Sequence, residues 1–496
     1  MPPTGNPPLS LSKGRVGTLP RIDTVRGSKS AIPVSILSHS FAHLQAGREC
    51  GLIPAMKSIV MYAALAAAVF ASAALAQDDE QPSAARLALA RACDARHAAN
   101  TNRYAGDPVR FVARGVLADK AARTVTLDAF TTGVGPGDVA EFFLITENSG
   151  HGYESLLTAF AKADDVCKAI EFIGVPRGRG VDYDRYVFWP KGERVIATAR
   201  IGDAPPVPLA SLMKDRQTGA PVELTGFIYT GDRRDAAGAF IGDSSGPGSI
   251  ASCYNEPITA LDIPRLALQS EVYENFVVGP AFPTNADLRV EIVLAPEPRP
   301  ADSPRRVLDV ALAFTTNGVA VDDAAPAPLA EAFATLQVST QAARDVYAAA
   351  TWAAELPVAQ IRDVCRVLKM LDSDGGVRLE PPVPGDPYYK AFVPNESWRN
   401  RAQRPTQPCE LRFDAQGKAT LVVIEEIWKD GEIDPELKVS EVAGVSAAAL
   451  PALLAEKKPD LAVLLVFAPG AMRYGDLKPY LSAVLPTHPN LYVFVE

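Results

Sequence analysis

The sequence is poor in the side chains that most often carry chemistry. Its 496 residues include only five histidines and six cysteines, and no two cysteines are spaced as CxxC. Cysteines this sparse exclude a disulfide scaffold, and the missing CxxC argues against a structural zinc or thiol redox site. P-loop, GxGxxG, HExxH and EF-hand patterns are also missing. We therefore expect no cofactor and no metal, and a binding or structural protein is favoured over an enzyme.

Positive charge is also in deficit. Lysine and arginine number 49 against 58 aspartates and glutamates, for a formal charge of −9. Nucleic acids and anionic membrane surfaces bind proteins through clustered lysine and arginine. We therefore expect no nucleic acid partner.

A hydrophobic leader begins well inside the chain. Met56-Lys57 opens an uncharged, alanine-rich run, Ser58–Leu75, which closes on a small-x-small site at Ala76. This pattern is typical of a secretory signal peptide, so we predict a signal at 56–76 and a periplasmic or secreted protein. Residues 1–55 are then a disordered leader upstream of the true translation start. An organellar transit peptide and an uncleaved anchor stay open as alternatives.

Cleavage after Ala76 would leave 42 basic against 56 acidic residues, a formal charge of −14. No later hydrophobic run is long enough to span a bilayer, so we expect no stable membrane span after cleavage. An oxidising compartment permits up to two disulfides and one spare thiol. Cys167 and Cys365 fall within apolar helical patterns, which favours buried thiols there. The cysteines of the mature chain are Cys93, Cys167, Cys253, Cys365 and Cys409.

The sequence predicts an α+β protein of two domains, each with helices packed on a mixed β-sheet. The first domain is expected at 84–280. A proline-rich linker at 295–305 follows, because four prolines in ten residues oppose regular structure. The second domain is expected at 306–496 as an α/β region with two βαβ units.

Local patterns place the expected elements. In the first domain we expect helices at Ala84–Ala98, at Tyr153–Ala161 and from an N-cap at Asp164. Strands are expected there at Arg110–Leu117, Thr124–Phe130, Ala140–Thr146, Tyr186–Trp189, Arg194–Arg200, Val222–Tyr229 and Glu271–Val278. In the second domain a strand at Arg306–Phe314 and a helix at Pro328–Leu336 precede the two βαβ units. These units are Asp345–Trp352, a helix after Pro357 and Val377–Leu379, then Leu461–Ala468, a helix from Tyr474 and Leu491–Val495.

Four segments of the first domain resemble, in the same order, the YdjY-type family of bacterial domains of unknown function. They are Glu141–Leu157, Asp164–Gly178, Phe188–Val195 and Gly226–Arg234. The resemblance covers Asp107–Val278 and implies a shared fold. The family has no known activity to carry over.

The end of the chain, Asp460–Val495, is similar to the periplasmic domain of the ExbD/TolR family. The similar text includes Pro469-Gly470 and Tyr474–Leu477. Members of that family are stator partners of proton-driven motors and use a carboxylate inside their membrane helix, whereas Ser58–Ala76 contains no acid. The resemblance therefore implies a fold and a cell-envelope binding role without energy coupling.

The string Gly242–Pro247 (GDSSGP) resembles the nucleophile loop of chymotrypsin-like proteases. Ser244 would be the nucleophile, although Ser245 stands where that family has glycine. A triad also needs a histidine base oriented by a buried aspartate. Clustered glycine, aspartate, serine and proline are typical of a turn. We predict a turn, and a hydrolase acting through Ser244 is the alternative.

A second candidate site is the loop around His151. Glycines on both sides of His151 would let backbone N–H groups approach an anion, and His151 and Glu154 are close enough in sequence to share a metal. An acid at the start of a helix is also favourable for electrostatic reasons alone. We name His151, Tyr153 and Glu154 as ligand-binding candidates, with a metal-dependent hydrolase as the alternative.

Aromatic and basic residues mix in a third segment. Tyr388 and Tyr389 precede Trp398, and Arg399, Arg401 and Arg404 follow. Such a surface can bind a peptide or sugar by stacking and cation–π contact. The alternative is an edge strand followed by a solvated loop. The sequence thus predicts an exported binding or structural protein whose partner is a cell-envelope protein or peptidoglycan.

Overall fold

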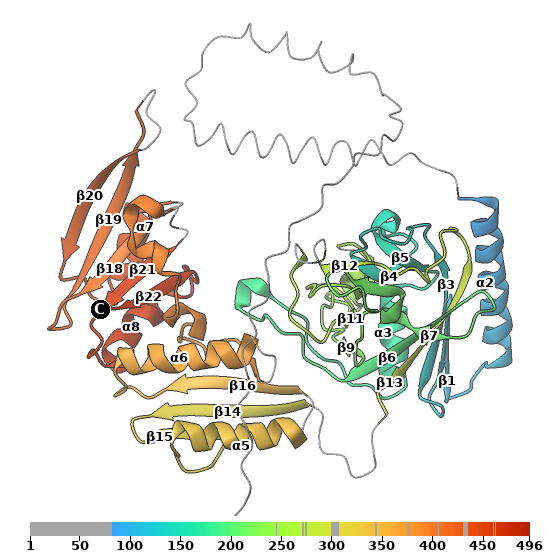
Figure 1. Cartoon of the computed structure of the whole chain (residues 1–496), viewed down its shortest axis with the longest axis horizontal. Coiled ribbons are helices and arrows are strands. Elements are labelled where there is room, and N and C mark those ends of the chain that lie inside the picture. Colours follow the sequence, from blue (N-terminus) through green and yellow to red (C-terminus); the bar gives the residue numbers. More distant parts are fainter. Residues whose placement is uncertain are drawn as a thin grey trace, which may run out of the picture. The chain divides into compact units, whose positions relative to one another are not determined.

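A computed structural model describes residues 82–298 and 307–496, apart from 245, 270–271, 273–274, 343–344, 374–376, 405, 430–434, 460 and 462. These residues lie within the unit Asp79–Glu496, whose helices and strands are labelled in Figure 1. Helices and mixed sheets alternate along it, which confirms the predicted α+β class. The leader at 1–55 and the signal peptide at 56–76 lie outside the described residues.

The first region begins with the predicted helix, α2 (Ala84–Arg103). The single strand expected next is instead a hairpin of β1 (Arg110–Ala113) and β2 (Val116–Asp119). Gly115 makes the turn with a φ of +69°, and a Cβ there would lie 3.0 Å from the backbone of Ala161. The chain therefore reverses where the alternation of apolar residues predicts continuous strand.

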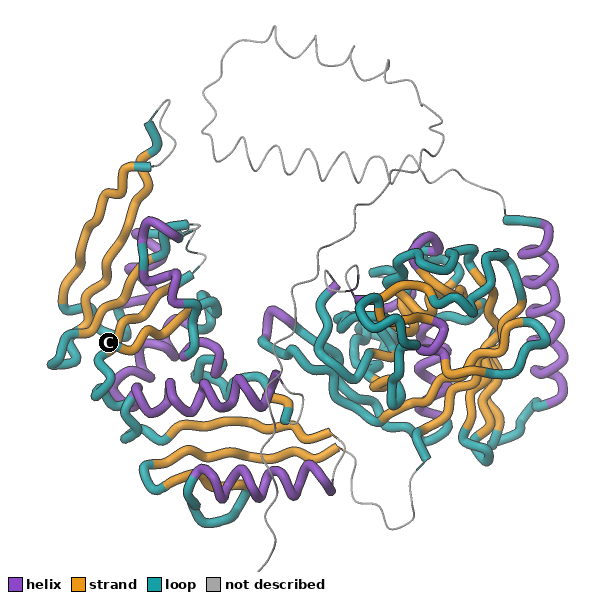
Figure 2. The backbone as a smooth tube through the Cα atoms, viewed as in Figure 1, coloured by secondary structure: helices purple, strands orange, loops and turns teal. Residues whose placement is uncertain are grey.

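Eight strands of the first sheet close into a ring, because β3 pairs with β5 as well as with β13. Their side chains form one large core. Figure 2 shows that extensive loops and turns, coloured teal, connect these strands. In order around the ring the strands are β3 (Thr124–Thr131), β13 (Arg289–Pro296), β6 (Arg194–Ile201), β9 (Phe227–Tyr229), β11 (Leu261–Asp262), β10 (Ser249–Ser252), β4 (Phe142–Thr146) and β5 (Ser155–Ala159). Short strands outside the ring are β7 (Val207–Pro208), β8 (Met213–Asp215) and β12 (Phe276–Val278).

Strand β13 lies beyond the expected domain boundary at 280. It pairs with β3 on one side and β6 on the other, so it is central to the first sheet. Ala295 and Pro296, assigned to the linker from sequence, are its last two residues. The linker residues at 299–305 lie outside the described residues.

The prediction of a helix at Tyr153–Ala161 is wrong. A single 3₁₀ turn at Gly152–Glu154 leads into β5, whose residues are all buried and which pairs with β3 and β4. Burial on both faces removes the alternation that identifies a strand, so its apolar run resembles a helix in sequence. The next helix, α3 (Ala163–Phe172), is present as expected, but Lys162 is its N-cap residue.

Other expected strands of this region differ in extent. Tyr186–Trp189 forms no strand, and among the described residues strand is confined to Phe227–Tyr229 in Val222–Tyr229 and to Phe276–Val278 in Glu271–Val278. Several apolar residues of these segments are buried outside any strand, a context that propensity alone does not distinguish.

The second region contains the βαβ units expected from sequence, built on two sheets that share one core. The first sheet is ordered β15-β14-β16-β17 and the second β20-β19-β18-β21-β22. The first sheet and its helices comprise β14 (Val307–Thr315), β15 (Gly318–Val321), α5 (Leu329–Ala342), β16 (Asp345–Trp352), α6 (Val358–Ser373) and β17 (Arg378–Leu379). The second comprises β18 (Cys409–Phe413), β19 (Ala419–Ile427), β20 (Glu436–Ala443), α7 (Leu450–Lys457), β21 (Leu464–Ala468), α8 (Tyr474–Val484) and β22 (Leu491–Val495).

The two sheets repeat one topology. In each, an antiparallel hairpin is followed by a helix, a strand parallel to the first hairpin strand, a second helix and a final parallel strand. The second copy adds β20, which extends its hairpin with mostly exposed residues. In this repeat α6 corresponds to α8, and β17 corresponds to β22.

Reciprocal hydrogen bonds join the two copies at the starts of α6 and α8. Val358, the first residue of α6, donates its N–H to Met472, and Tyr474, the first residue of α8, donates to Leu356. The second residues, Ala359 and Gly475, likewise donate to Gly470 and Ala354. Each helix thus satisfies N–H groups that lack intrahelical partners with the loop that precedes the other helix.

Two further observations bear on expectations from composition. No helix in the described ranges is long and apolar enough to cross a membrane. All five cysteines from Cys93 onward are buried, and none is joined in a disulfide. Buried thiols at Cys167 and Cys365 are as expected.

Candidate functional site

Tyr388 and Tyr389 are buried, so the expectation of an exposed aromatic surface is wrong for both. Tyr388 stacks on Tyr186, with ring centroids 5.7 Å apart, and its ring also contacts Phe188. Tyr389 donates its hydroxyl to Asp372 at 2.6 Å. Tyr388 therefore packs against a loop of the chain's own first region, whereas Tyr389 bonds within the second region. Burial raises the pKa of both phenols.

Asp372 completes this contact between the two regions. Its carboxylate accepts hydrogen bonds from the indole of Trp189 at 2.7 Å and from the backbone of Leu379 at 3.0 Å. Close by, the buried Asp345 carboxylate binds Arg194 of the first region and Arg378 of the second. These groups build an internal interface and leave no aromatic recognition surface at Tyr388 and Tyr389.

Trp398 lies apart from that interface. It is half-buried beside Tyr492, with ring centroids 5.9 Å apart, and packs on a small apolar cluster around Phe467 and Phe494. Its backbone carbonyl accepts a hydrogen bond from Arg404 at 2.6 Å. Trp398 and the two tyrosines therefore do not form one site.

His151, Tyr153 and Glu154 do lie together. His151 Nδ1 is 2.5 Å from the Oε1 of Glu154, and the imidazole contacts the rings of Phe142 and Tyr153. Tyr153 is 70% exposed. Among the described residues no three His, Cys, Asp or Glu side chains are grouped so that they could hold a metal ion. The pair is a local contact at a 3₁₀ turn, and a ligand role for it stays a prediction.

The Ser244 loop has a structural use. The hydroxyl of Ser244 donates to the carbonyl of Ile241 at 3.3 Å. The neighbouring Asp243 accepts from the N–H groups of Ala163 and Asp164 at 2.7 and 3.0 Å, which caps the start of α3 from a distant loop. Within the described ranges no hydrogen bond joins Ser244 to a histidine. The expected turn fits this geometry, and the triad arrangement is not formed.

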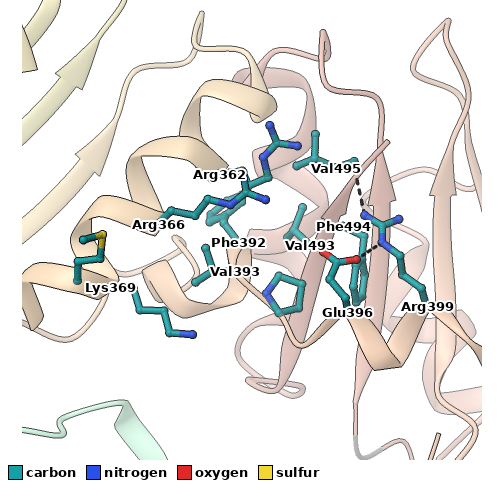
Figure 3. A pocket seen from close by; sticks show the side chains of 12 residues that line it. Arg362, Arg366, Lys369, Phe392, Val393, Glu396, Arg399, Val493, Phe494 and Val495 are labelled. Atoms are coloured by element: carbon teal, nitrogen blue, oxygen red, sulfur yellow. Dashed lines mark hydrogen bonds and ion pairs between the residues drawn. The ribbon is translucent and has the colours of Figure 1, made fainter. Parts of the chain in front are cut away.

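A pocket of about 470 Å³ opens between α6 and β22, and sequence reasoning missed it. Figure 3 shows basic side chains from α6 on one side and Arg399 with the end of β22 on the other. Aromatic and apolar residues make up most of the remaining wall. The lining residues are Arg362, Arg366, Lys369, Met370, Phe392, Val393, Pro394, Glu396, Arg399, Val493, Phe494 and Val495.

Positive charge exceeds negative charge around this pocket. Arg362 and Arg366 share the single carboxylate of Asp363, at 2.9 and 3.2 Å. Arg399 contacts Glu396, donates to the carbonyl of Val495 at 3.1 Å and lies over the ring of Phe494. With Lys369, four cationic side chains line the pocket, and among the described residues Glu396 is the one acidic side chain that lines it. A basic pocket in a chain of charge −9 is a local reversal of sign.

The pocket opens on the edge of β22. The N–H of Leu464 donates to the carbonyl of Asn490. The N–H of Glu496 donates to the carbonyl of residue 468, and the carbonyl of Glu496 accepts from the N–H of residue 470. The backbone groups of the even-numbered residues of β22 therefore point toward β21. The backbone groups of Val493 and Val495 therefore point away from β21, and the carbonyl of Val495 accepts a hydrogen bond from Arg399. A bound ligand would meet backbone donors and acceptors here as well as cations.

The basic positions of α6 carry a recognisable spacing. Arg362, Arg366 and Lys369 recur at intervals of four and three, which places them on one helical face. Our interpretation of the sequence used only the apolar face of this helix. The partner wall could not have been found, because β22 lies more than a hundred residues away in the chain.

Comparisons with known proteins supply no relative: no family model, no curated protein and no solved structure matches the chain.

Proposed function

We propose that the chain is an exported binding protein of the cell envelope whose pocket between α6 and β22 takes an anionic ligand. The concentration of four cationic side chains at one pocket, in an otherwise acidic chain, carries this proposal. Guanidinium groups bind carboxylates and phosphates through paired N–H donors, so the arginines suit an anion. The signal-like segment at 56–76 supports export.

The lining also restricts the kind of anion. Phe392, Val393 and Val493 give the pocket an apolar wall beside its arginines. A volume of about 470 Å³ lies within the range of small-ligand sites. The ligand we propose therefore combines an acidic group with an apolar body, as a peptide segment or a peptidoglycan fragment does.

Anion titrations of the full chain test the binding role. We expect citrate and pyrophosphate to bind by calorimetry, with affinity that falls as salt is raised. The double substitution Arg362→Gln with Arg366→Gln should lower the affinity for both anions at least tenfold. Arg473→Gln is the matched control, because it also removes one positive charge from an arginine that is paired with an aspartate close by in sequence, Asp476. Equal weakening by the control, or no anion binding at all, would refute the role of the pocket.

Export has its own test. We expect the native protein to fractionate with the soluble cell envelope and to begin at Gln77. A cytoplasmic protein that still begins at Met1 would contradict the proposed location but would leave the proposed binding role of the pocket unaffected.

A further inference from the structure

The internal repeat supplies a template for what the pocket binds. Counted from their first residues, the fifth and ninth positions are Lys478 and Ser482 in α8, and Arg362 and Arg366 in α6. The reciprocal hydrogen bonds at the two helix starts fix this correspondence. What contacts these positions on α8 therefore indicates what would suit the same positions on α6.

On α8 both positions contact the chain's own segment 381–387 (PPVPGDP). Lys478 Nζ lies 2.8 Å from the Oδ1 of Asp386, whose carboxylate also accepts from the hydroxyl of Tyr474. Ser482 donates to the carbonyl of Gly385 at 2.6 Å. One helical turn thus binds a carboxylate, and the next binds a backbone carbonyl.

On α6 the same two positions line the open pocket. Arg362 and Arg366 carry more donors than Lys478 and Ser482, and within the described residues they form ion pairs with Asp363 alone. An arginine can bind a carboxylate or a backbone carbonyl through its fork of N–H groups. The two arginines therefore offer the contacts that α8 makes, with added positive charge.

We propose that this pocket binds a proline-rich acidic segment of another polypeptide, in extended conformation, with a carboxylate at Arg362 and a backbone carbonyl at Arg366. The inference depends on the proposed anion-binding function and specifies its ligand. The unpaired backbone edge at Val493 lies beside the path of such a segment and provides hydrogen bonds to it. Proline suits the segment because it lowers the entropy lost on ordering.

Two labelled peptides test the proposal against the full chain by fluorescence anisotropy. One has the sequence of residues 381–387, and the other differs only in carrying asparagine for aspartate. We expect the aspartate peptide to bind at least tenfold more tightly, because asparagine removes the charge from the hydrogen-bonded pair with Arg362. Arg362→Gln should remove that difference, and Arg473→Gln should keep it.

Each other outcome counts against the proposal. Equal binding of the two peptides, or an undiminished preference in Arg362→Gln, overturns it. Binding of citrate and pyrophosphate without peptide binding overturns it while leaving the anion-binding function intact. A peptidoglycan disaccharide-peptide that binds where the aspartate peptide does not also overturns it. Circular dichroism of Arg362→Gln checks that the variant is folded, as expected for a partly exposed side chain whose ion-pair partner, Asp363, is exposed.

Discussion

Lys478 and Asp386 form an ion pair, 2.8 Å between Nζ and Oδ1, at the position of α8 that corresponds to Arg362 in α6. One copy of the repeat therefore contains the contact that the other copy leaves open. The Asp386 carboxylate is buried and held by both Lys478 and Tyr474.

This contrast predicts different costs for substitutions at the two places. Asp386→Asn should lower the free energy of unfolding by about 1–3 kcal/mol, because it weakens a buried charged hydrogen bond. Arg362→Gln should change it by only about 0.5 kcal/mol, since its partner Asp363 is exposed. Urea denaturation of both variants measures the difference. An equal loss in the two would show that position 362 is already a structural contact.

Asp345 is predicted to be the most sensitive carboxylate between the two regions. It binds Arg194 through two bonds of 3.0 and 2.7 Å and Arg378 at 2.6 Å, and all three side chains are buried. Asp345→Asn leaves two buried cations uncompensated, so we expect a loss of about 3–5 kcal/mol in thermal or urea unfolding. Asp309→Asn, in the exposed pair with Lys191, is the control and should cost less than about 1 kcal/mol. Comparable losses would contradict the burial argument.

We expect the stability of the fold to depend on pH through the buried carboxyl of Glu256. Burial raises the pKa of its carboxyl to about 8, a hydrogen bond with Ser249 acts in the opposite direction, and its Oε2 has no hydrogen-bond partner. Because the folded pKa lies above the unfolded one, the protonated form stabilises the fold. That contribution is complete below about pH 4.5 and is lost as the pH rises through about 8, with a loss on the order of 4 kcal/mol.

Glu256→Gln keeps the shape of the side chain and removes the titration. We expect its unfolding free energy to vary less between pH 5 and pH 8 than that of the unaltered chain, with the variant the more stable at pH 8. Urea unfolding across this range measures both. A variant whose pH profile matches the unaltered chain would mean that Glu256 does not carry the effect.

The cysteines predict a labelling pattern. Burial raises the pKa of Cys93 to about 11 and of Cys167 to about 12, and all five cysteines from Cys93 onward are buried. Thiolates are the reactive form, so these residues should react slowly with iodoacetamide in the native state and rapidly in guanidinium. Mass spectrometry counts the labels. Five labels gained only on unfolding fit the structure, whereas disulfide-linked peptides in a non-reducing digest would contradict it.

The sequence was sufficient for the elements with regular periodicity. The parallel units around α6 and α8 followed from apolar residues at helical spacing between continuous apolar strands. The strand at Ser155–Ala159 was mistaken for helix because burial on both faces removes alternation. β13 was missed because prolines at its end indicated a linker, although Pro296 is tolerated at a strand terminus.

The candidate site was harder to predict, for a physical reason. Tyr388 and Tyr389 have the composition of a recognition surface, but Tyr388 stacks on Tyr186, two hundred residues earlier in the same chain, and Tyr389 donates its hydroxyl to the buried Asp372. The basic pocket joins Arg362 to Val495, which only the fold brings together. The spacing of residues along the sequence can place the basic residues of α6 on one face of the helix, but it cannot show that β22 forms the opposite wall.

A charge-swap titration tests the pocket most directly. Arg362→Asp is titrated with the 381–387 peptide and with the same peptide carrying lysine in place of its aspartate. We predict that the affinity of the variant for the aspartate peptide falls at least tenfold. Its affinity for the lysine peptide should rise by a similar factor, because the ion pair is restored with reversed signs. An Arg362→Asp protein that still prefers the aspartate peptide would contradict an anionic ligand at α6.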